Sequence, residues 1–79
     1  MAENKGSETY RAFDNARICF QKYREQTYWD YHANSDKTVF MQMICDLRYY
    51  AKIRKWDWAE VLDGAAVNFD GTEEREKTT

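Results

Sequence analysis

The sequence predicts an all-α protein with a single small domain, and three observations support this fold class. The 79 residues include no proline and only three glycines, so long helices can form without a break. Hydrophobic residues make up 43% of the chain. They recur every three or four positions, which is the spacing of a helix face. We expect a three-helix domain, in which a long antiparallel helical hairpin is followed by a shorter third helix.

The first helix is expected over residues 8–32, with Ser7 as its N-cap. Apolar and aromatic residues spaced by three and four positions form the face that should meet the core. The polar residues 1–6, which precede the cap, are expected to be disordered.

Two large apolar residues of this helix point away from the predicted core. Ile18 and Trp29 are eleven residues apart, which is three helical turns, and Tyr28 lies on their flank. An exposed pair of this kind is typical of a protein interface. The alternative is that the helix bends or breaks near Gln26 and that Trp29 turns inward.

The central helix is expected over residues 35–55, after a polar turn at residues 33–37 that makes the first two helices antiparallel neighbours. It has two apolar faces. The predicted core face consists of Phe40, Met43, Ile44, Leu47, Tyr50 and Ala51. The opposite face consists of Met41, Cys45, Tyr49 and Ile53. A helix that is apolar on two sides needs two partners.

The third helix should begin at Trp58, because Asp57 and Glu60 have the spacing of a capping box. Gly71 is expected to end it. The predicted domain therefore covers residues 7–71. The remaining residues, 72–79, have no apolar periodicity and are expected to form a disordered charged tail.

Charge is unevenly distributed along the chain. The net charge is −2, which excludes a strongly basic nucleic-acid binder on net charge alone. Residues 1–56 carry ten Lys or Arg and seven acids, whereas residues 57–79 carry two and seven. This asymmetry either steers a charged partner or belongs to solvated helix faces. The sequence has neither a signal peptide nor an apolar run of about 18 residues, so we expect a cytoplasmic protein that does not enter membranes.

Chemistry-bearing motifs are scarce in this sequence. There is no glycine-rich phosphate loop, no serine elbow and no HExxH pattern. Cys19 and Cys45 lack the spacing of a zinc site, and the single histidine, His32, fits a helix end. We expect no enzymatic activity, no metal and no cofactor.

A basic cluster lies at the end of the central helix and consists of Arg48, Lys52, Arg54 and Lys55. Aromatic residues are interleaved with it, which suggests a phosphate-contacting patch for single-stranded nucleic acid. The alternative is that these cations complement the C-terminal end of the helix dipole and that most of the nearby rings belong to the core.

One region resembles known small proteins. Residues 46–51 (DLRYYA), 56–58 (WDW) and 61–65 (VLDGA) are similar to a helical pattern found in small phage and mobile-element proteins. The resemblance covers residues 46–69. It departs at Trp56, where glycine is usual, and at Asn68-Phe69, which replaces a closing His-Tyr pair. It implies a protein that inhibits a bacterial defence complex, such as a CRISPR effector.

These observations favour a protein-binding module. Its predicted binding residues are Ile18, Tyr28, Trp29, Met41, Cys45, Tyr49 and Ile53. We expect a homodimer through the opposite face of the central helix, unless that face is reserved for a foreign protein. The alternative functions are a nucleic-acid-associated regulator, which would use Arg48, Lys52, Arg54 and Lys55, and a purely structural oligomer subunit.

Overall fold

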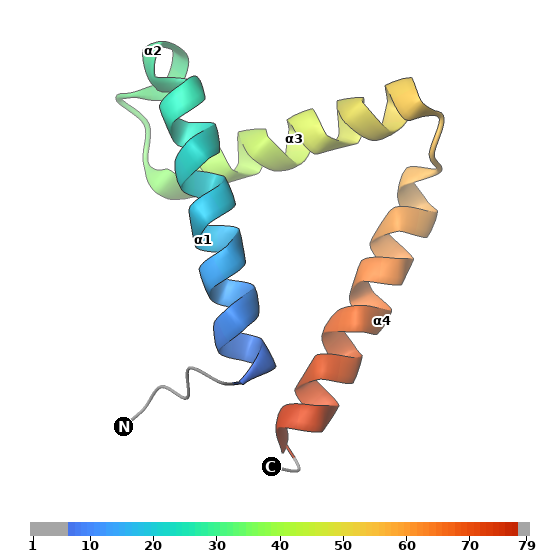
Figure 1. The fold of residues 1–79 in the computed structure, drawn as a ribbon. Helices are drawn as coiled ribbons and strands as arrows, with labels where there is room; N and C mark the ends of the chain where they lie inside the picture. The colour runs from blue at the N-terminus through green and yellow to red at the C-terminus, as the bar shows by residue number, and fades with distance from the viewer. Residues whose placement is uncertain (1–6, 78–79) are drawn as a thin grey trace.

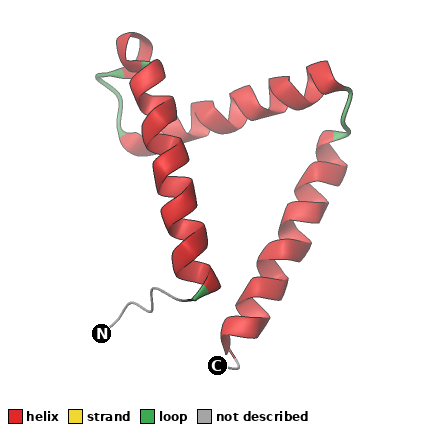
Figure 2. Cartoon of the chain, viewed as in Figure 1, coloured by secondary structure: helices red, strands yellow, loops and turns green. Residues whose placement is uncertain are grey.

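The computed structural model describes residues 7–77, and within them the chain forms helices only. The helices are α1 (Glu8–Gln26), α2 (Tyr28–Tyr31), α3 (Asp36–Arg54) and α4 (Trp58–Lys77), joined by short loops (Figure 2). The predicted all-α class is confirmed.

Side-chain N-caps define the starts of the three long helices, and those at Ser7 and Asp57 were predicted. The Ser7 hydroxyl accepts a hydrogen bond of 3.0 Å from a backbone N–H in the first turn of α1. Ser35 does the same for α3 at 3.2 Å. An Asp57 carboxylate oxygen accepts from the backbone N–H of Ala59 at 3.2 Å, so α4 begins at Trp58 as predicted. Each bond satisfies a donor that the helix itself leaves unpaired.

The first helix ends earlier than the predicted boundary at His32. It stops at Gln26, and the hydroxyl of Thr27 donates a 3.0 Å hydrogen bond to the carbonyl oxygen of Tyr23. Threonine side chains that bond back to the helix in this way compete with its regular backbone pattern. The single turn α2 follows, so the chain has four helices rather than three. The break matches the alternative considered from the sequence, but Trp29 does not turn inward, since it is 84% exposed.

The long helices form the sides of an open triangle (Figure 1). Helix α1 crosses α3 near the start of α3 and then diverges from it, while α4 leaves the far end of α3 and returns toward the start of α1. The predicted long antiparallel hairpin is therefore not confirmed.

The triangle is a single layer of helices. Its principal extents are 42 × 33 × 15 Å, and one helix with its side chains is about 10–12 Å across. The radius of gyration is 15.1 Å, whereas a compact domain of this length has about 12 Å. A one-layer arrangement has no second layer to cover the apolar helix faces.

Burial reflects this open arrangement. Among the described residues, only Val39 and Ala51 are buried hydrophobic residues. The prediction that this face of the central helix is buried is therefore wrong for most of its residues. Leu47, in the middle of that face, is 46% exposed, and Phe40 and Tyr50 are similarly open. Leu47 and Tyr50 lie beyond the part of α3 that α1 crosses (Figure 1), whereas Phe40 lies at the crossing and is covered only in part.

Helix α4 continues through Gly71, where it was predicted to end, and reaches Lys77. Gly71 does not adopt the left-handed conformation of a terminating glycine. The helix end is also held to α1, because Arg75 Nη2 lies 2.6 Å from Glu8 Oε1. The predicted charged tail is thus helical over residues 72–77. The predicted disordered segment at residues 1–6 and the last two residues of the tail lie outside the described part of the chain.

Candidate functional site

The corner between α3 and α4 is built by a tight backbone turn. Lys55 follows α3 in the left-handed conformation, with φ 64° and ψ 34°. The backbone N–H of Trp56 donates a 2.9 Å hydrogen bond to the carbonyl oxygen of Ala51. The backbone N–H of Lys55 donates a 3.1 Å hydrogen bond to the carbonyl oxygen of Lys52. These bonds satisfy carbonyls at the end of α3, as in a Schellman motif. The turn sets the direction in which α4 leaves.

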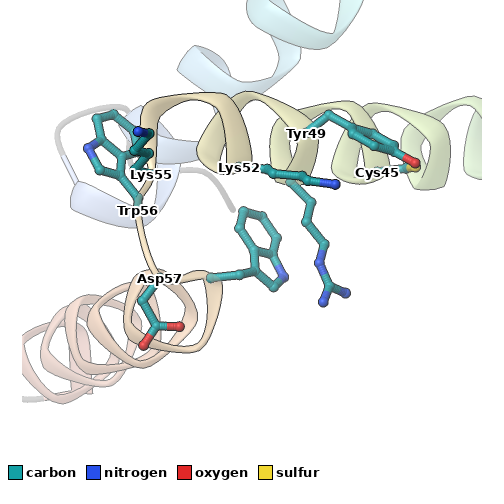
Figure 3. Close-up of a pocket in the computed structure, with 8 residues that line it drawn as sticks. Cys45, Tyr49, Lys52, Lys55, Trp56 and Asp57 are labelled. Carbon is teal, nitrogen blue, oxygen red and sulfur yellow. The ribbon is translucent and has the colours of Figure 1, made fainter.

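A groove of about 840 Å³ lies inside this corner (Figure 3). It is lined by Cys45, Arg48, Tyr49, Lys52, Lys55, Trp56, Asp57 and Trp58. The four residues from α3 are spaced by three, one and three positions, so they share one helix face. We call this hollow the corner groove.

The corner groove combines residues from both predicted sites. Cys45 and Tyr49 belong to the predicted protein-binding face, whereas Arg48, Lys52 and Lys55 belong to the predicted nucleic-acid cluster. From the sequence alone, the two sets are competing candidate sites. In the structure they form one surface that is both basic and aromatic, because the two stripes are adjacent on α3.

The fourth predicted cation is held elsewhere. The Arg54 guanidinium carbon lies 5.1 Å from the ring centroid of Trp56 and 5.8 Å from that of Tyr50. Its Nη1 also donates a 3.2 Å hydrogen bond to the Tyr50 hydroxyl. Arg54 is therefore part of an aromatic stack at the end of α3 and does not line the groove. By contrast, Arg48, Lys52 and Lys55 form no ion pair with another described residue.

The remaining predicted protein-binding residues are also exposed. Met41 and Ile53 lie on α3 beyond the groove lining, and Ile53 is 77% exposed. Ile18 lies on α1, whereas Tyr28 and Trp29 are on α2 with ring centroids 5.2 Å apart. The predicted pairing of Ile18 with Trp29 along one helix was wrong, because the break at residue 27 places them on different helices.

A polar contact that the sequence did not reveal fixes α1 on α3. The Tyr23 hydroxyl donates to Asp46 Oδ2 at 2.5 Å, and Gln42 Nε2 donates to Asp46 Oδ1 at 3.0 Å. Burial raises the pKa of Tyr23, and the hydrogen bond to Asp46 raises it further. The α1 side also contributes Phe20, whose ring meets Phe40 edge-on at 5.5 Å. These residues hold the crossing together and lie outside the groove lining.

The described residues contain no cluster of three or more metal-ligating side chains. Cys19 and Cys45 are both free and exposed. The ring of His32 packs on Tyr28 with centroids 5.1 Å apart, at the end of α2. None of the helices over residues 7–77 has the length and apolarity needed to cross a membrane.

Comparison with known proteins adds no relative. No family model, no curated protein and no solved structure matches this chain.

Proposed function

We propose that this chain is a non-enzymatic protein-binding module that buries its open apolar surface on a partner. The observation that carries the proposal is the burial pattern. Two hydrophobic residues are buried, whereas sixteen large hydrophobic side chains are exposed among the described residues. Monomeric proteins rarely expose apolar surface on this scale without a binding role.

The predicted binding residues are part of this surface. Met41, Tyr49 and Ile53 lie along α3, and Trp29 is the most exposed of the sixteen. Aromatic residues of this kind contribute strongly to interfaces when a partner desolvates them. The resemblance to small phage proteins suggests one class of foreign partner, a bacterial defence complex such as a CRISPR effector, met in the cytoplasm of the host.

Affinity capture with matched variants tests this function. The wild-type chain, Ile53→Asp, Trp29→Ala and the control Lys22→Glu are each immobilised and exposed to bacterial lysate and to free wild-type chain. We expect specific partners to be lost from the first two variants and kept by the control, which changes a charge on α1. The same bound proteins on all four surfaces would contradict the proposal.

Nucleic-acid binding is a second candidate, favoured by the cations and tryptophans of the corner groove. Two features oppose it. Asp57 lines the groove, and α4, which begins at the groove with Trp58, carries six acids and two bases over residues 58–77. These acids oppose a long polyanion that extends beyond the groove along α4, whereas a protein with charges matched to the groove and to α4 avoids the repulsion.

Fluorescence anisotropy with a labelled 20-nucleotide oligothymidine distinguishes this candidate. A groove that binds single strands should show an affinity that falls steeply as salt rises, and Lys52→Glu should weaken it about tenfold. The control Lys37→Glu makes the same charge change at the other end of α3. Absence of binding in 50 mM salt would exclude the nucleic-acid function.

A further inference from the structure

The corner groove has a net positive charge next to apolar surface, because three cations and one carboxylate, that of Asp57, line it. Arg48, Lys52 and Lys55 line it without forming an ion pair to another described residue, and Tyr49, Trp56 and Trp58 supply aromatic surface. An occupant that fits must therefore be acidic and partly apolar. It must also be a folded element or a chain large enough to occupy about 840 Å³.

Helix α4 of the same protein has this chemistry on its surface. Spacings of three and four residues place one stripe along a single face of α4, which we call the acidic stripe: Glu60, Asp63, Val67, Asp70 and Glu74. Its central residue, Val67, is 69% exposed. The acids of this stripe form no ion pair with another described residue.

The acidic stripe does not occupy the groove of its own chain. The lining of the corner groove includes only Trp58 from α4. The apolar side of the helix carries Leu62 and Phe69, and Phe69 lines a second hollow of about 440 Å³ against α1. Val67 lies on the opposite side of the helix from Leu62 and Phe69, whereas Asp70 lies at the edge between the two sides. The stripe is therefore free to enter the groove of a second molecule.

The chain exposes more surface than a compact monomer of its mass. Its accessible surface is 6816 Å², whereas a compact monomer of this mass exposes about 5,000 Å². The excess is about 1,800 Å² per chain, and two chains that buried it would share about 3,600 Å². Obligate homodimers bury about 2,000–5,000 Å² in total.

We propose that two copies form a two-fold dimer in which the acidic stripe of each copy lies in the corner groove of the other. This inference rests on the proposed function and names its partner. A two-fold axis produces both groove-to-stripe contacts at once, so the interface closes on itself. Pairing α3 against α3 through Met41, Cys45, Tyr49 and Ile53 is less favourable, because it brings the groove cations of both copies together.

Reciprocal charge reversal tests this arrangement. The groove variant is Arg48→Glu/Lys52→Glu, and the stripe variant is Asp63→Lys/Asp70→Lys. Sedimentation equilibrium at micromolar concentration should show the wild-type dimer and, for each variant alone, association at least 100-fold weaker. An equimolar mixture should restore a 1:1 heterodimer, because an acidic groove then meets a basic stripe and a basic groove meets an acidic one. The control Lys22→Glu/Lys37→Glu should remain dimeric.

Three outcomes would overturn the proposal in distinguishable ways. A dimer that persists in the stripe variant would show that another surface, such as α3 against α3, forms the interface. A monomer with a radius of gyration near 15 Å would leave the surface for a foreign protein and preserve the proposed function. A monomer near 12 Å would contradict the open structure and both proposals. Circular dichroism of each variant verifies that its helices are intact.

Discussion

The two ends of α3 contrast sharply. At the α1–α3 crossing, Val39 is fully buried, and Tyr23 and Asp46 form a hydrogen bond between the helices. At the α3–α4 corner, the side-chain contacts join near neighbours such as Tyr50 and Trp56, and the remaining space is the open corner groove. One end of the helix is packed within the chain, and the other end is open to solvent.

This contrast separates stability from binding. Substitutions at the crossing should change the free energy of unfolding, because they alter contacts that exist in a single chain. Substitutions in the corner groove should mainly change association, since the side chains there already face solvent. The following predictions test this division, beginning with the largest effect.

At the crossing, Val39→Ala should lower the free energy of unfolding by about 2 kcal/mol, because it removes buried methyl groups and leaves a cavity. The matched control is Val67→Ala, the same change at a position that is 69% exposed, which should cost less than about 0.5 kcal/mol. Urea denaturation at low protein concentration measures both. Equal losses would show that the crossing is not the stable centre of the fold.

Tyr23→Phe should cost about 1–2 kcal/mol, because Asp46 loses the hydroxyl donor that bridges α1 and α3. The control Tyr49→Phe removes a hydroxyl in the open groove and should have little effect. Urea denaturation at neutral pH compares the two.

The same contact predicts a dependence on alkaline pH. The pKa of Tyr23 is raised above its ordinary value of 10.0 by burial and by its bond to Asp46. Its contribution to stability is therefore fully present below pH 10 and is lost as the pH rises through the higher folded-state value. In an ultraviolet titration, wild type should show a late tyrosine ionisation above pH 10, and Tyr23→Phe should remove that late step. A titration of wild type without a late step would contradict the contact.

At the corner, Asp57→Ala should remove the cap of α4 and cost about 1 kcal/mol. The control Asp63→Ala removes an exposed carboxylate from the interior of the same helix and should leave the unfolding free energy of the monomer nearly unchanged. Thermal unfolding followed by circular dichroism compares them. Equal melting temperatures for Asp57→Ala and wild type would mean that α4 begins elsewhere.

The smallest effect concerns the third contact of the triangle, between α1 and α4. The hydrogen bond from Arg75 lowers the pKa of Glu8 below its ordinary value of 4.5. The stabilisation is present above pH 4.5 and is lost as the pH falls through the lower folded-state value. Arg75→Ala should reduce the slope of melting temperature against pH between 2 and 5. The control Arg17→Ala removes an ion pair within α1 and should leave the part of this slope that comes from Glu8 unchanged.

Local features of the fold followed from the sequence. Ser7 and Asp57 indicated where α1 and α4 begin, because an N-cap depends on a few neighbouring residues. For α3 the sequence left Asn34, Ser35 and Asp36 as candidate caps, and Ser35 is the one used. Cys45 and Tyr49, which have the spacing of one face of α3, are both exposed. Each of these signals depends on residues within a few helical turns of one another.

The arrangement of the helices could not be read in the same way. Val39 belonged to neither predicted stripe, yet the crossing buries it completely. Gly71 suggested a helix end, but α4 continues to Lys77, and Arg75 in this extension forms an ion pair with Glu8 of α1. The groove combined two candidate sites that the sequence kept apart, because the direction of α4 depends on the left-handed turn at Lys55. Periodicity shows which faces are apolar and leaves open what covers them.

The most direct test of this account is small-angle X-ray scattering of the groove variant Arg48→Glu/Lys52→Glu, which should be monomeric, at concentrations where no association occurs. The account predicts a radius of gyration close to the 15.1 Å of the open triangle. A value near 12 Å, which is that of a compact domain of this length, would show that a single chain closes its own apolar surface and would contradict the central claim.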